Sequence, residues 1–348
     1  MSNSKEKIDS FIQTAKSIVV TSHLSPDPDA LGSALGVWFY IKNNFPDKKV
    51  KVVFEGLPAK LGSFLSGFSE ITWTTNLSME LKDADLIFFV DGSLFSRFTS
   101  YPKEIDFQKL LTVCIDHHPE PVPDPFTLRL CDTVAAATSQ QVAEIFFDGG
   151  VNNVTPEVAE VLLVGIIGDT GNFRFIDPSK TRVLIVTEKL IRAGKVNLQL
   201  LFLKLNQFES NALDLLKVLT KNCCRLNSEK IPSVAYSWLP LSTLEECDLP
   251  SIKDAYHFFH DSFLRPVSNT TWTFLVTPNA KDHYNISFRS IPGGPNVQVL
   301  AQLFGGGGHP LSSGGKYPTV ENGVQVTAEE VCQKVLEVYE KEKIPLTS

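Results

Sequence analysis

Aspartate and histidine residues follow several apolar segments of this sequence, where their side chains could gather into a metal site. These residues are His23, Asp27, Asp29, Asp91, Asp116, His117, His118 and Asp169. Mixed shells of imidazole and carboxylate bind borderline-hard divalent ions. Pairs of such ions, about 3.5 to 4 Å apart, recur in proteins that split phosphate esters. The residue types therefore point to two-metal hydrolysis of a phosphate ester.

Each of these residues also has a purely structural interpretation. A single histidine such as His23 is more often a hydrogen-bond donor than a ligand, and Asp27 and Asp29 could be the N-cap and a turn residue of the helix that follows. We favour the metal site because crowded carboxylates repel one another unless a cation lies among them. His117 and His118 are adjacent, so on an extended segment one ring would face a metal and the other the opposite side.

The elements that must position these side chains alternate between strands and helices. We expect strands at 17–21, 50–54, 85–90 and 110–115 and helices at 30–41, 138–147 and 156–167. Near-continuous apolar strands separated by helices are typical of a parallel sheet covered on both faces. The carboxyl ends of such strands meet at one edge of the sheet, where ligands bind. The candidate residues can therefore converge although they are scattered along the chain.

Beyond these elements the composition changes. We expect a helical linker at 196–222, strands at 233–238, 271–276 and 284–289, and a closing helix at 328–342. The predicted fold class is α/β. A doubly wound, mostly parallel N-terminal sheet with helices on both faces, residues 1–195, would be joined by the linker to a smaller α/β domain, residues 223–348. The active-site cleft would lie between them.

Length and composition limit the class of protein. The chain has 348 residues, 43 % hydrophobic and 20 % charged, which fits two globular domains in water. No apolar run reaches the roughly 18 to 20 residues that span a bilayer, and we find no secretory signal, so we expect a cytoplasmic protein with no membrane partner. Six cysteines without a Cys-x-x-Cys pair agree with a reducing compartment. The net charge of −7 argues against capture of duplex DNA.

Several motifs, in this order, resemble those of the DHH phosphoesterase superfamily. They are His23-x-x-x-Asp27-x-Asp29, Asp91, Asp116-His117-His118, Gly168-Asp169-Thr-Gly-Asn-Phe-Arg174 and Gly305-Gly-Gly-Gly-His309. The resemblance covers nearly the whole chain. It is greatest to two-domain bacterial members that degrade short oligoribonucleotides and 3′-phosphoadenosine 5′-phosphate, or linear and cyclic dinucleotides. One departure is Pro28, where the family commonly has a small residue; both flanking aspartates remain, so we still expect activity.

The resemblance implies roles for the N-terminal residues. One ion would be held by His23, Asp27 and Asp91 and the other by Asp29, His117 and Asp169, with Asp91 bridging. The implied cofactor is Mn²⁺, two ions per site, with Mg²⁺ or Co²⁺ as alternatives, and a bridging hydroxide would attack phosphorus. The catalytic residues would be Asp91, Asp116 and His118. His118 would donate a hydrogen bond or proton to the scissile phosphate or leaving oxygen, and Asp116 would orient an imidazole.

The C-terminal motif implies a site for the non-scissile end of a nucleotide. The candidate substrate-binding residues are Arg289, Gly307, Gly308, His309 and Ser313. Glycine amides can approach an anion closely, and arginine offers a fixed fork of donors to a terminal phosphate. Taken alone, the glycine run fits a flexible loop or a hairpin equally well. His257 and His260 stand three apart, as helical neighbours do, but no carboxylate or thiol pattern accompanies them, so we expect no further metal site there.

The resulting prediction is a phosphohydrolase that acts on short oligoribonucleotides or dinucleotides, on 3′-phosphoadenosine 5′-phosphate, or on both. Three alternatives stay open: a cyclic dinucleotide phosphodiesterase, an inorganic pyrophosphatase, and an inactive nucleotide-binding sensor. The glycine-rich motif disfavours the pyrophosphatase, because those enzymes carry a different partner domain. The expected partners are a short RNA or a small nucleotide, and a homodimer is expected from the resemblance alone.

Overall fold

The computed structural model, which describes residues 2–58, 62–119, 122–207 and 210–347, divides into two units, Met1–Gln207 and Phe208–Ser348. The segment expected to be one helical linker contains two helices. Helix α8 (Leu198–Leu205) packs on the core of the first unit, and helix α9 (Ala212–Lys221) packs on a core of the second. Helix α8 ends at Leu205, with Asn206 as its C-cap, so the expected connector is shared between the two units.

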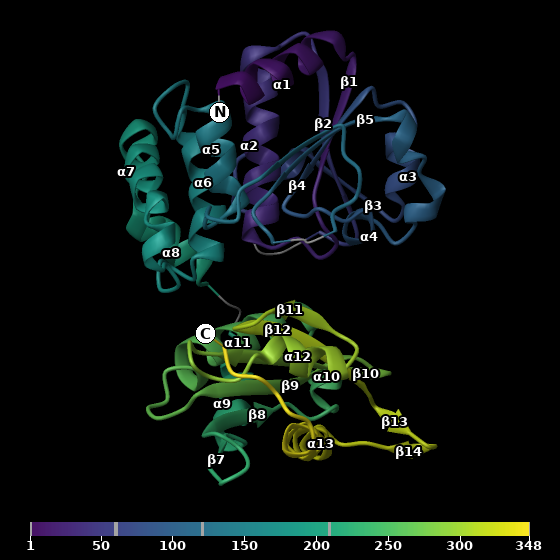
Figure 1. The fold of residues 1–348 in the computed structure, drawn as a ribbon, viewed down its shortest axis with the longest axis vertical. Helices are drawn as coiled ribbons and strands as arrows, with labels where there is room; N and C mark the ends of the chain where they lie inside the picture. Colours follow the sequence, from purple (N-terminus) through teal and green to yellow (C-terminus); the bar gives the residue numbers. More distant parts are fainter. Residues whose placement is uncertain (1, 59–61, 120–121, 208–209, 348) are drawn as a thin grey trace. The chain divides into compact units, whose positions relative to one another are not determined.

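The first unit alternates strands and helices (Figure 1). In chain order its elements are α1 (Ser2–Thr14), β1 (Ser17–Thr21), α2 (Pro28–Asn44), β2 (Lys49–Glu55), β3 (Ile71–Thr74), α3 (Leu77–Leu81), β4 (Leu86–Val90), α4 (Phe95–Phe98), β5 (Leu111–Asp116), β6 (Leu128–Cys131), α5 (Thr138–Phe146), α6 (Pro156–Asp169), α7 (Arg182–Gly194) and α8. Short 3-10 helices lie at Phe68–Glu70, Pro102–Glu104, Phe107–Lys109 and Pro178–Lys180.

The strands of the first unit form a six-stranded sheet in the order β3-β2-β1-β4-β5-β6, and every neighbouring pair is parallel. Both faces of the sheet are buried. Leu86, Phe88 and Val90 of β4 face a core shared with α1, α2, α5 and α6, whereas Ile87 and Phe89 face a core shared with α3 and α4. This two-sided burial explains the continuous apolar strand sequences and confirms the doubly wound prediction.

Two strands of this sheet, β3 and β6, were absent from the sequence prediction. Both lie at the edges of the sheet, and every residue of β6 is only partly buried. An edge strand is packed less completely than a central one, so its sequence lacks the apolar run that marks β1, β2, β4 and β5.

The second unit is built on a mixed six-stranded sheet in the order β11-β12-β10-β9-β8-β7, in which only the β8–β9 pair of the described strands is parallel. The strands are β7 (Cys224–Leu226), β8 (Val234–Trp238), β9 (Trp272–Ala280), β10 (His283–Ser290), β11 (Gly307–His309) and β12 (Ser312–Pro318), with a separate hairpin of β13 (Val320–Glu321) and β14 (Val324–Gln325). The helices are α9, α10 (Thr243–Glu246), α11 (Leu249–Phe259), α12 (Val297–Leu303) and α13 (Ala328–Lys341).

The two faces of this second sheet carry separate cores. Trp272, Phe274 and Phe288 are buried with residues of α12 and α13, and residues of α9 and α11 form the other core. A π-helical turn, His260–Leu264, continues α11. Within the described residues, no helix is long and apolar enough to cross a membrane.

Candidate metal centre and nucleotide pocket

Three adjacent strands bring the predicted metal-binding residues to one edge of the first sheet. Strand β1 leads to His23, β4 leads to Asp91, and β5 ends in Asp116, with His117 directly after it. Because β1, β4 and β5 are parallel neighbours, their carboxyl ends open at the same edge. Helices supply the rest, since α2 begins beside Asp27 and Asp29 and α6 ends at Asp169.

Helix α2 begins at Pro28, two residues before the predicted start, because its first turn is capped. The Asp27 carboxylate accepts hydrogen bonds from the backbone N–H groups of Asp29, at 2.9 Å, and Ala30, at 3.0 Å. Pro28 occupies the first helical position, where a missing N–H costs nothing and a fixed φ is favourable. The residue that departs from the family pattern is therefore well placed for starting the helix.

The structure gathers two groups of ligand atoms, each within 4.8 Å of one another: His23–Asp27–Asp91 and Asp29–His117–Asp169. In the first group, His23 Nε2 lies 3.7 Å from Asp27 Oδ2 and 3.4 Å from Asp91 Oδ2. In the second, His117 Nε2 lies 2.9 Å from Asp169 Oδ2 and also 3.7 Å from Asp91 Oδ1. Asp91 thus turns one oxygen toward each group. This is the arrangement that a bridging ligand requires.

The side-chain nitrogens of His23 have distinct roles. Its Nδ1 lies 2.9 Å from the carbonyl oxygen of Leu24. A carbonyl only accepts, so Nδ1 carries the proton when the ring is neutral and Nε2 presents its lone pair to the two carboxylates. A ligating histidine is commonly fixed in this way.

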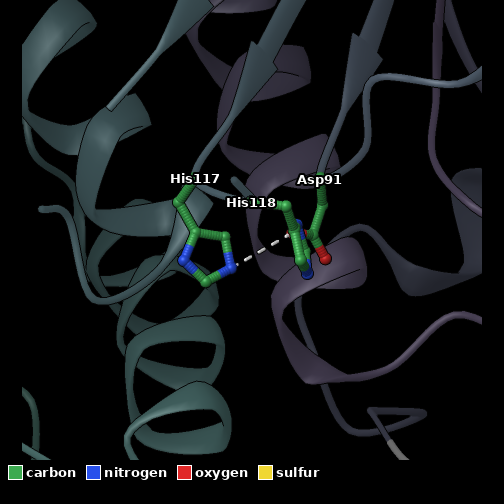
Figure 2. A group of neighbouring side chains, drawn as sticks. All are labelled: Asp91, His117 and His118. Carbon is green, nitrogen blue, oxygen red and sulfur yellow. Dashed lines mark ion pairs between the residues drawn. The ribbon is translucent and has the colours of Figure 1, made fainter. Parts of the chain in front are cut away.

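His117 and His118 approach the same carboxylate, contrary to the prediction that their rings point to opposite sides (Figure 2). His118 Nδ1 lies 3.6 Å from Asp91 Oδ1, and the two ring centroids are 4.4 Å apart with planes at 61°. The prediction assumed an extended chain, but β5 ends at Asp116 and the backbone bends at His118.

Asp116 orients His118 and is itself held by several donors. Its Oδ1 lies 2.8 Å from His118 Nδ1, and Ser93 Oγ donates to Oδ2. Burial favours the neutral acid, but these contacts outweigh it and hold the pKa of Asp116 below its usual value. The ionised carboxylate only accepts, so His118 Nδ1 donates to it. Asp91, His117 and His118 also lie close enough to hold a cation, but this bond makes His118 Nδ1 a poor ligand atom.

Residues that sequence reasoning missed fix the two central aspartates. The N–H groups of Thr138 and Ser139, the first residues of α5, donate to the two oxygens of Asp29 at 2.6 and 2.8 Å. The hydroxyl of Thr138 donates to Asp91 Oδ1 at 3.0 Å. Asp91 itself has a φ of 63°, a left-handed conformation that is uncommon for a residue with a side chain and that concentrates at functional sites.

Charge crowding shifts the pKa values in this cluster. Burial, together with repulsion from Asp91 and Asp169, raises the pKa of Asp29 well above its usual value. Burial also raises the pKa of Asp169. For His117, burial favours the neutral ring, but the carboxylate of Asp169 outweighs it and the pKa is raised. In the absence of cations the site therefore retains protons, and a bound divalent ion would displace them.

The second unit contains a cavity of about 420 Å³ that includes most of the predicted substrate-binding residues. Arg289, Gly307, Gly308 and Ser313 line it. Gly307 belongs to strand β11, which pairs antiparallel with β12, so this part of the glycine run forms a hairpin and not a flexible loop. Gly306, the residue directly before β11, must be glycine, because a β-carbon on it would lie 1.9 Å from the carbonyl oxygen of Gly314.

Three of the predicted substrate-binding residues have surroundings that the sequence did not indicate. His309 is exposed on β11 and is not among the residues that line the cavity. Ser313 Oγ donates to the His309 carbonyl at 2.6 Å, so its proton is used within the chain. Arg289 forms an ion pair with Asp261 on the π-helical turn, in which Arg289 Nε lies 3.4 Å from Asp261 Oδ1.

His257 and His260 are not part of any candidate metal group among the described residues. The His260 ring is fully buried, and its Nε2 lies 2.8 Å from the hydroxyl of Thr273. The six cysteines are free thiols.

Comparison with known proteins gives four consistent matches. Residues 17–166 match the model of the DHH family, N-terminal domain. The chain is 28 % identical over 313 residues to the bifunctional oligoribonuclease and PAP phosphatase NrnA of Bacillus subtilis (strain 168), covering 85 % of this chain and 88 % of that protein. It is 27 % identical to the protein of the same name from Mycoplasma pneumoniae, covering 94 % and 95 % of the two chains. An exopolyphosphatase-related protein from Bacteroides fragilis shares the fold, with a TM-score of 0.82 at 21 % identity over 98 % of this chain and 97 % of that one.

Proposed function

The chain carries an N-terminal domain of the DHH family at residues 17–166, and from this premise we propose that it hydrolyses short oligoribonucleotides to nucleoside monophosphates and 3′-phosphoadenosine 5′-phosphate to AMP. The observation that carries the proposal is the pair of ligand groups joined by Asp91. The relatives from Bacillus subtilis and Mycoplasma pneumoniae, whose names state an oligoribonuclease and a PAP phosphatase, support the substrate class.

The residues present fit two divalent cations. His117 Nε2 is buried and makes no hydrogen bond with the residues that the structure describes, while carboxylates of Asp91 and Asp169 face it. His23, Asp27 and Asp91 would hold one ion, and Asp29, His117 and Asp169 the other. The mixed nitrogen and oxygen donors favour Mn²⁺, with Co²⁺ and Mg²⁺ as weaker alternatives, because Mg²⁺ prefers oxygen ligands and its own waters. When bound, the ions would lower the pKa of water and neutralise charge on the phosphoryl oxygens.

His118 is the residue we assign to proton delivery. Its Nδ1 is bonded to Asp116, so the ring is fixed and Nε2, on its opposite edge, would face the scissile phosphate. Asp116 fixes the orientation of the ring, because its carboxylate accepts from both Nδ1–H and the backbone N–H of His118. His118 would therefore hydrogen-bond a phosphate oxygen and protonate the leaving oxygen.

The cavity of the second unit would bind the non-scissile end of the nucleotide. Arg289 supplies a cation and a planar set of donors, and Gly307 leaves open space in the same cavity, since a β-carbon on Gly307 would meet no atom within 4 Å. A small nucleotide matches a cavity of this size, as ligand pockets generally measure about 300 to 1,000 Å³. The acidic chain offers no long basic track for duplex DNA.

We further propose that the enzyme works in the cytoplasm, a compartment in which the six free thiols would persist. Homodimerisation stays a prediction that rests on the family resemblance.

Purified protein tests the proposal in a hydrolysis screen. The substrates are a 5′-phosphorylated dinucleotide, 3′-phosphoadenosine 5′-phosphate, a cyclic dinucleotide and pyrophosphate, each with Mn²⁺, Co²⁺ or Mg²⁺. We expect mononucleotide release from the first two, strongest with Mn²⁺, and its loss in Asp91→Ala. Asp282→Ala, which removes an exposed carboxylate of the second unit, is the matched control and should stay active. Turnover of pyrophosphate alone, or of none of the substrates, would overturn the proposal.

A further inference from the structure

We infer that Thr138 is a positioning residue whose hydroxyl fixes how Asp91 divides its two oxygens between the two ligand groups. The inference rests on the proposed two-metal function and goes beyond the ligands themselves. Thr138 is fully buried and contacts both central aspartates. Its backbone N–H holds Asp29, a ligand of the second group, and its hydroxyl holds Asp91, the ligand that both groups share.

Asp91 needs an external anchor for its carboxylate. The last torsion of an aspartate side chain is broad and roughly two-fold, so the rotamer of Asp91 does not by itself fix where each oxygen lies. Its Oδ2 faces His23 at 3.4 Å, whereas its Oδ1 faces His117 at 3.7 Å. The hydroxyl of Thr138 donates to Oδ1 at 3.0 Å. This bond holds Oδ1 on the His117 side of the site.

Asp29 is anchored in a different way. The residue before α5, Ala137, offers no side-chain cap, and the carboxylate of Asp29 takes that place by accepting from the N–H groups of Thr138 and Ser139. Backbone donors at the start of a helix attract a carboxylate and do not depend on the side chain. A substitution at 138 therefore leaves the anchor of Asp29 intact and removes only the anchor of Asp91.

The carboxylates of Asp29 and Asp91 repel each other, so the Thr138 hydroxyl is needed to keep Asp91 Oδ1 in place. Asp91 Oδ1 lies 3.7 Å from His117 Nε2, and a carboxylate oxygen of Asp29 lies within 4.8 Å of a ring nitrogen of the same histidine, so the two carboxylates are close enough to interact inside the protein. Thr138 places one donor on each of them, with N–H on Asp29 and O–H on Asp91. Once the O–H donor is lost, repulsion from Asp29 favours rotation of the Asp91 carboxylate away from the second group.

The chain offers a matched set of variants. Thr138→Val keeps the shape of the side chain and removes the hydroxyl, and Thr138→Ser keeps the hydroxyl. Ser139→Ala is the control, because the Ser139 hydroxyl is buried and makes no hydrogen bond with the described residues, whereas its backbone N–H, which survives the substitution, holds Asp29. Thr138→Ala removes the same hydroxyl and provides the test should the valine variant fail to fold.

The experiment is titration of each metal-free protein with Mn²⁺ by calorimetry, together with EPR of the loaded protein to separate coupled Mn²⁺ pairs from single ions. For Thr138→Val we expect one of two Mn²⁺ dissociation constants to rise about 10- to 100-fold, the usual effect of removing a partner of a metal ligand. The fraction of coupled pairs should fall with it. Thr138→Ser and Ser139→Ala should bind both ions as the wild type does.

The outcomes separate this inference from the proposed function. A wild type that binds no Mn²⁺ would overturn the proposed function and the role of Thr138 with it. A wild type that binds two ions, beside a Thr138→Val variant that binds both equally well, would overturn the inference alone. The inference also fails if Ser139→Ala weakens one ion as much as Thr138→Val does, because the effect would then be general disturbance of the start of α5.

Discussion

Gly168 and Pro28 touch where two helices that carry candidate ligands meet. A β-carbon on Gly168 would lie 2.6 Å from Cβ and 2.9 Å from Cγ of Pro28. Carbon atoms pack at about 3.5 to 4.0 Å, so Gly168→Ala must move α6 and α2 apart locally by roughly 1 Å. Asp169 follows Gly168 and Asp29 follows Pro28 in the sequence. The substitution therefore separates two candidate ligands of one cation.

Gly168→Ala should change both the unfolding free energy and the free energy of Mn²⁺ binding. Alanine in a helix is favoured over glycine by about 1 kcal/mol, whereas overpacking costs about 1 to 3 kcal/mol, so the unfolding free energy of the metal-free protein should fall by no more than about 2 kcal/mol. Ligand distances tolerate only about 0.2 Å. We therefore expect Mn²⁺ affinity to fall about 10- to 100-fold, which is about 1.4 to 2.8 kcal/mol.

A double-mutant cycle measured by Mn²⁺ calorimetry checks this reasoning. Pro28→Gly removes every Pro28 atom that the new β-carbon would meet, so Pro28→Gly/Gly168→Ala should recover most of the affinity lost in Gly168→Ala. Gly307→Ala is the control, since a β-carbon there meets no atom within 4 Å and metal binding should not change. Additive effects of the two substitutions, or normal Mn²⁺ binding by Gly168→Ala, would refute the steric argument.

Three further predictions concern other contacts. Asp116→Asn should lower kcat about 10- to 100-fold and leave Mn²⁺ affinity unchanged, because Asp116 orients His118; loss of Mn²⁺ in calorimetry would instead place Asp116 among the ligands. Glu55→Gln should lower the unfolding free energy by about 1 to 3 kcal/mol at pH 7, because the buried carboxylate accepts hydrogen bonds from two backbone amides and a hydroxyl. Burial opposes ionisation of Glu55, but these hydrogen bonds outweigh it and lower the pKa of Glu55. The stability that Glu55 contributes is therefore complete above the unfolded-state pKa of about 4.3 and is lost as the pH falls through the lower pKa of the folded state. A difference in Tm between wild type and Glu55→Gln that stays constant down to about pH 3 would contradict this. Asp261→Ala should raise KM several-fold with kcat unchanged by releasing Arg289, and Asp261→Asn should do the same, because the contact with Arg289 is an ion pair and asparagine carries no charge; a lower KM in both variants would show that Asp261 only offsets the charge of Arg289.

The parts of the fold that the sequence predicted are those with a clear burial pattern, either continuous as in β4 or alternating as in β10. Strand β4 has no exposed residue, and its apolar run marks it without ambiguity. Strand β6 is partly buried along its whole length, and Arg129 and Cys131 interrupt any apolar pattern. Strand β11 consists of two glycines and His309, and glycine has no side chain from which a period of two can be read. The glycine run therefore fitted a loop or a hairpin equally well, and only the structure shows that β11 pairs with β12.

The candidate site shows the same division. Residues at the ends of β1, β4 and β5 could be grouped in advance, because parallel strands deliver their ends to one edge. The contribution of Ser139 could not, because it acts through a backbone N–H that nearly every residue possesses. Thr138 offered only a hydroxyl at a helix start, which resembles an ordinary cap. Ser313 lines the cavity as a candidate contact, but the sequence did not indicate that its hydroxyl donates to the carbonyl oxygen of His309.

The structural and functional interpretations of Asp27 are compatible, because a carboxylate has two oxygens. Oδ1 caps α2 by accepting from the N–H groups of Asp29 and Ala30, and Oδ2 lies 3.7 Å from His23 Nε2. The cap fixes the position of the carboxylate, and this lowers the entropic cost of ordering the ligand when a cation binds. Asp29 is held in the same way, because both of its oxygens accept hydrogen bonds from N–H groups at the start of α5. A helix start is therefore a place where an aspartate can be held rigidly for a metal, and its cap pattern is no evidence against ligation.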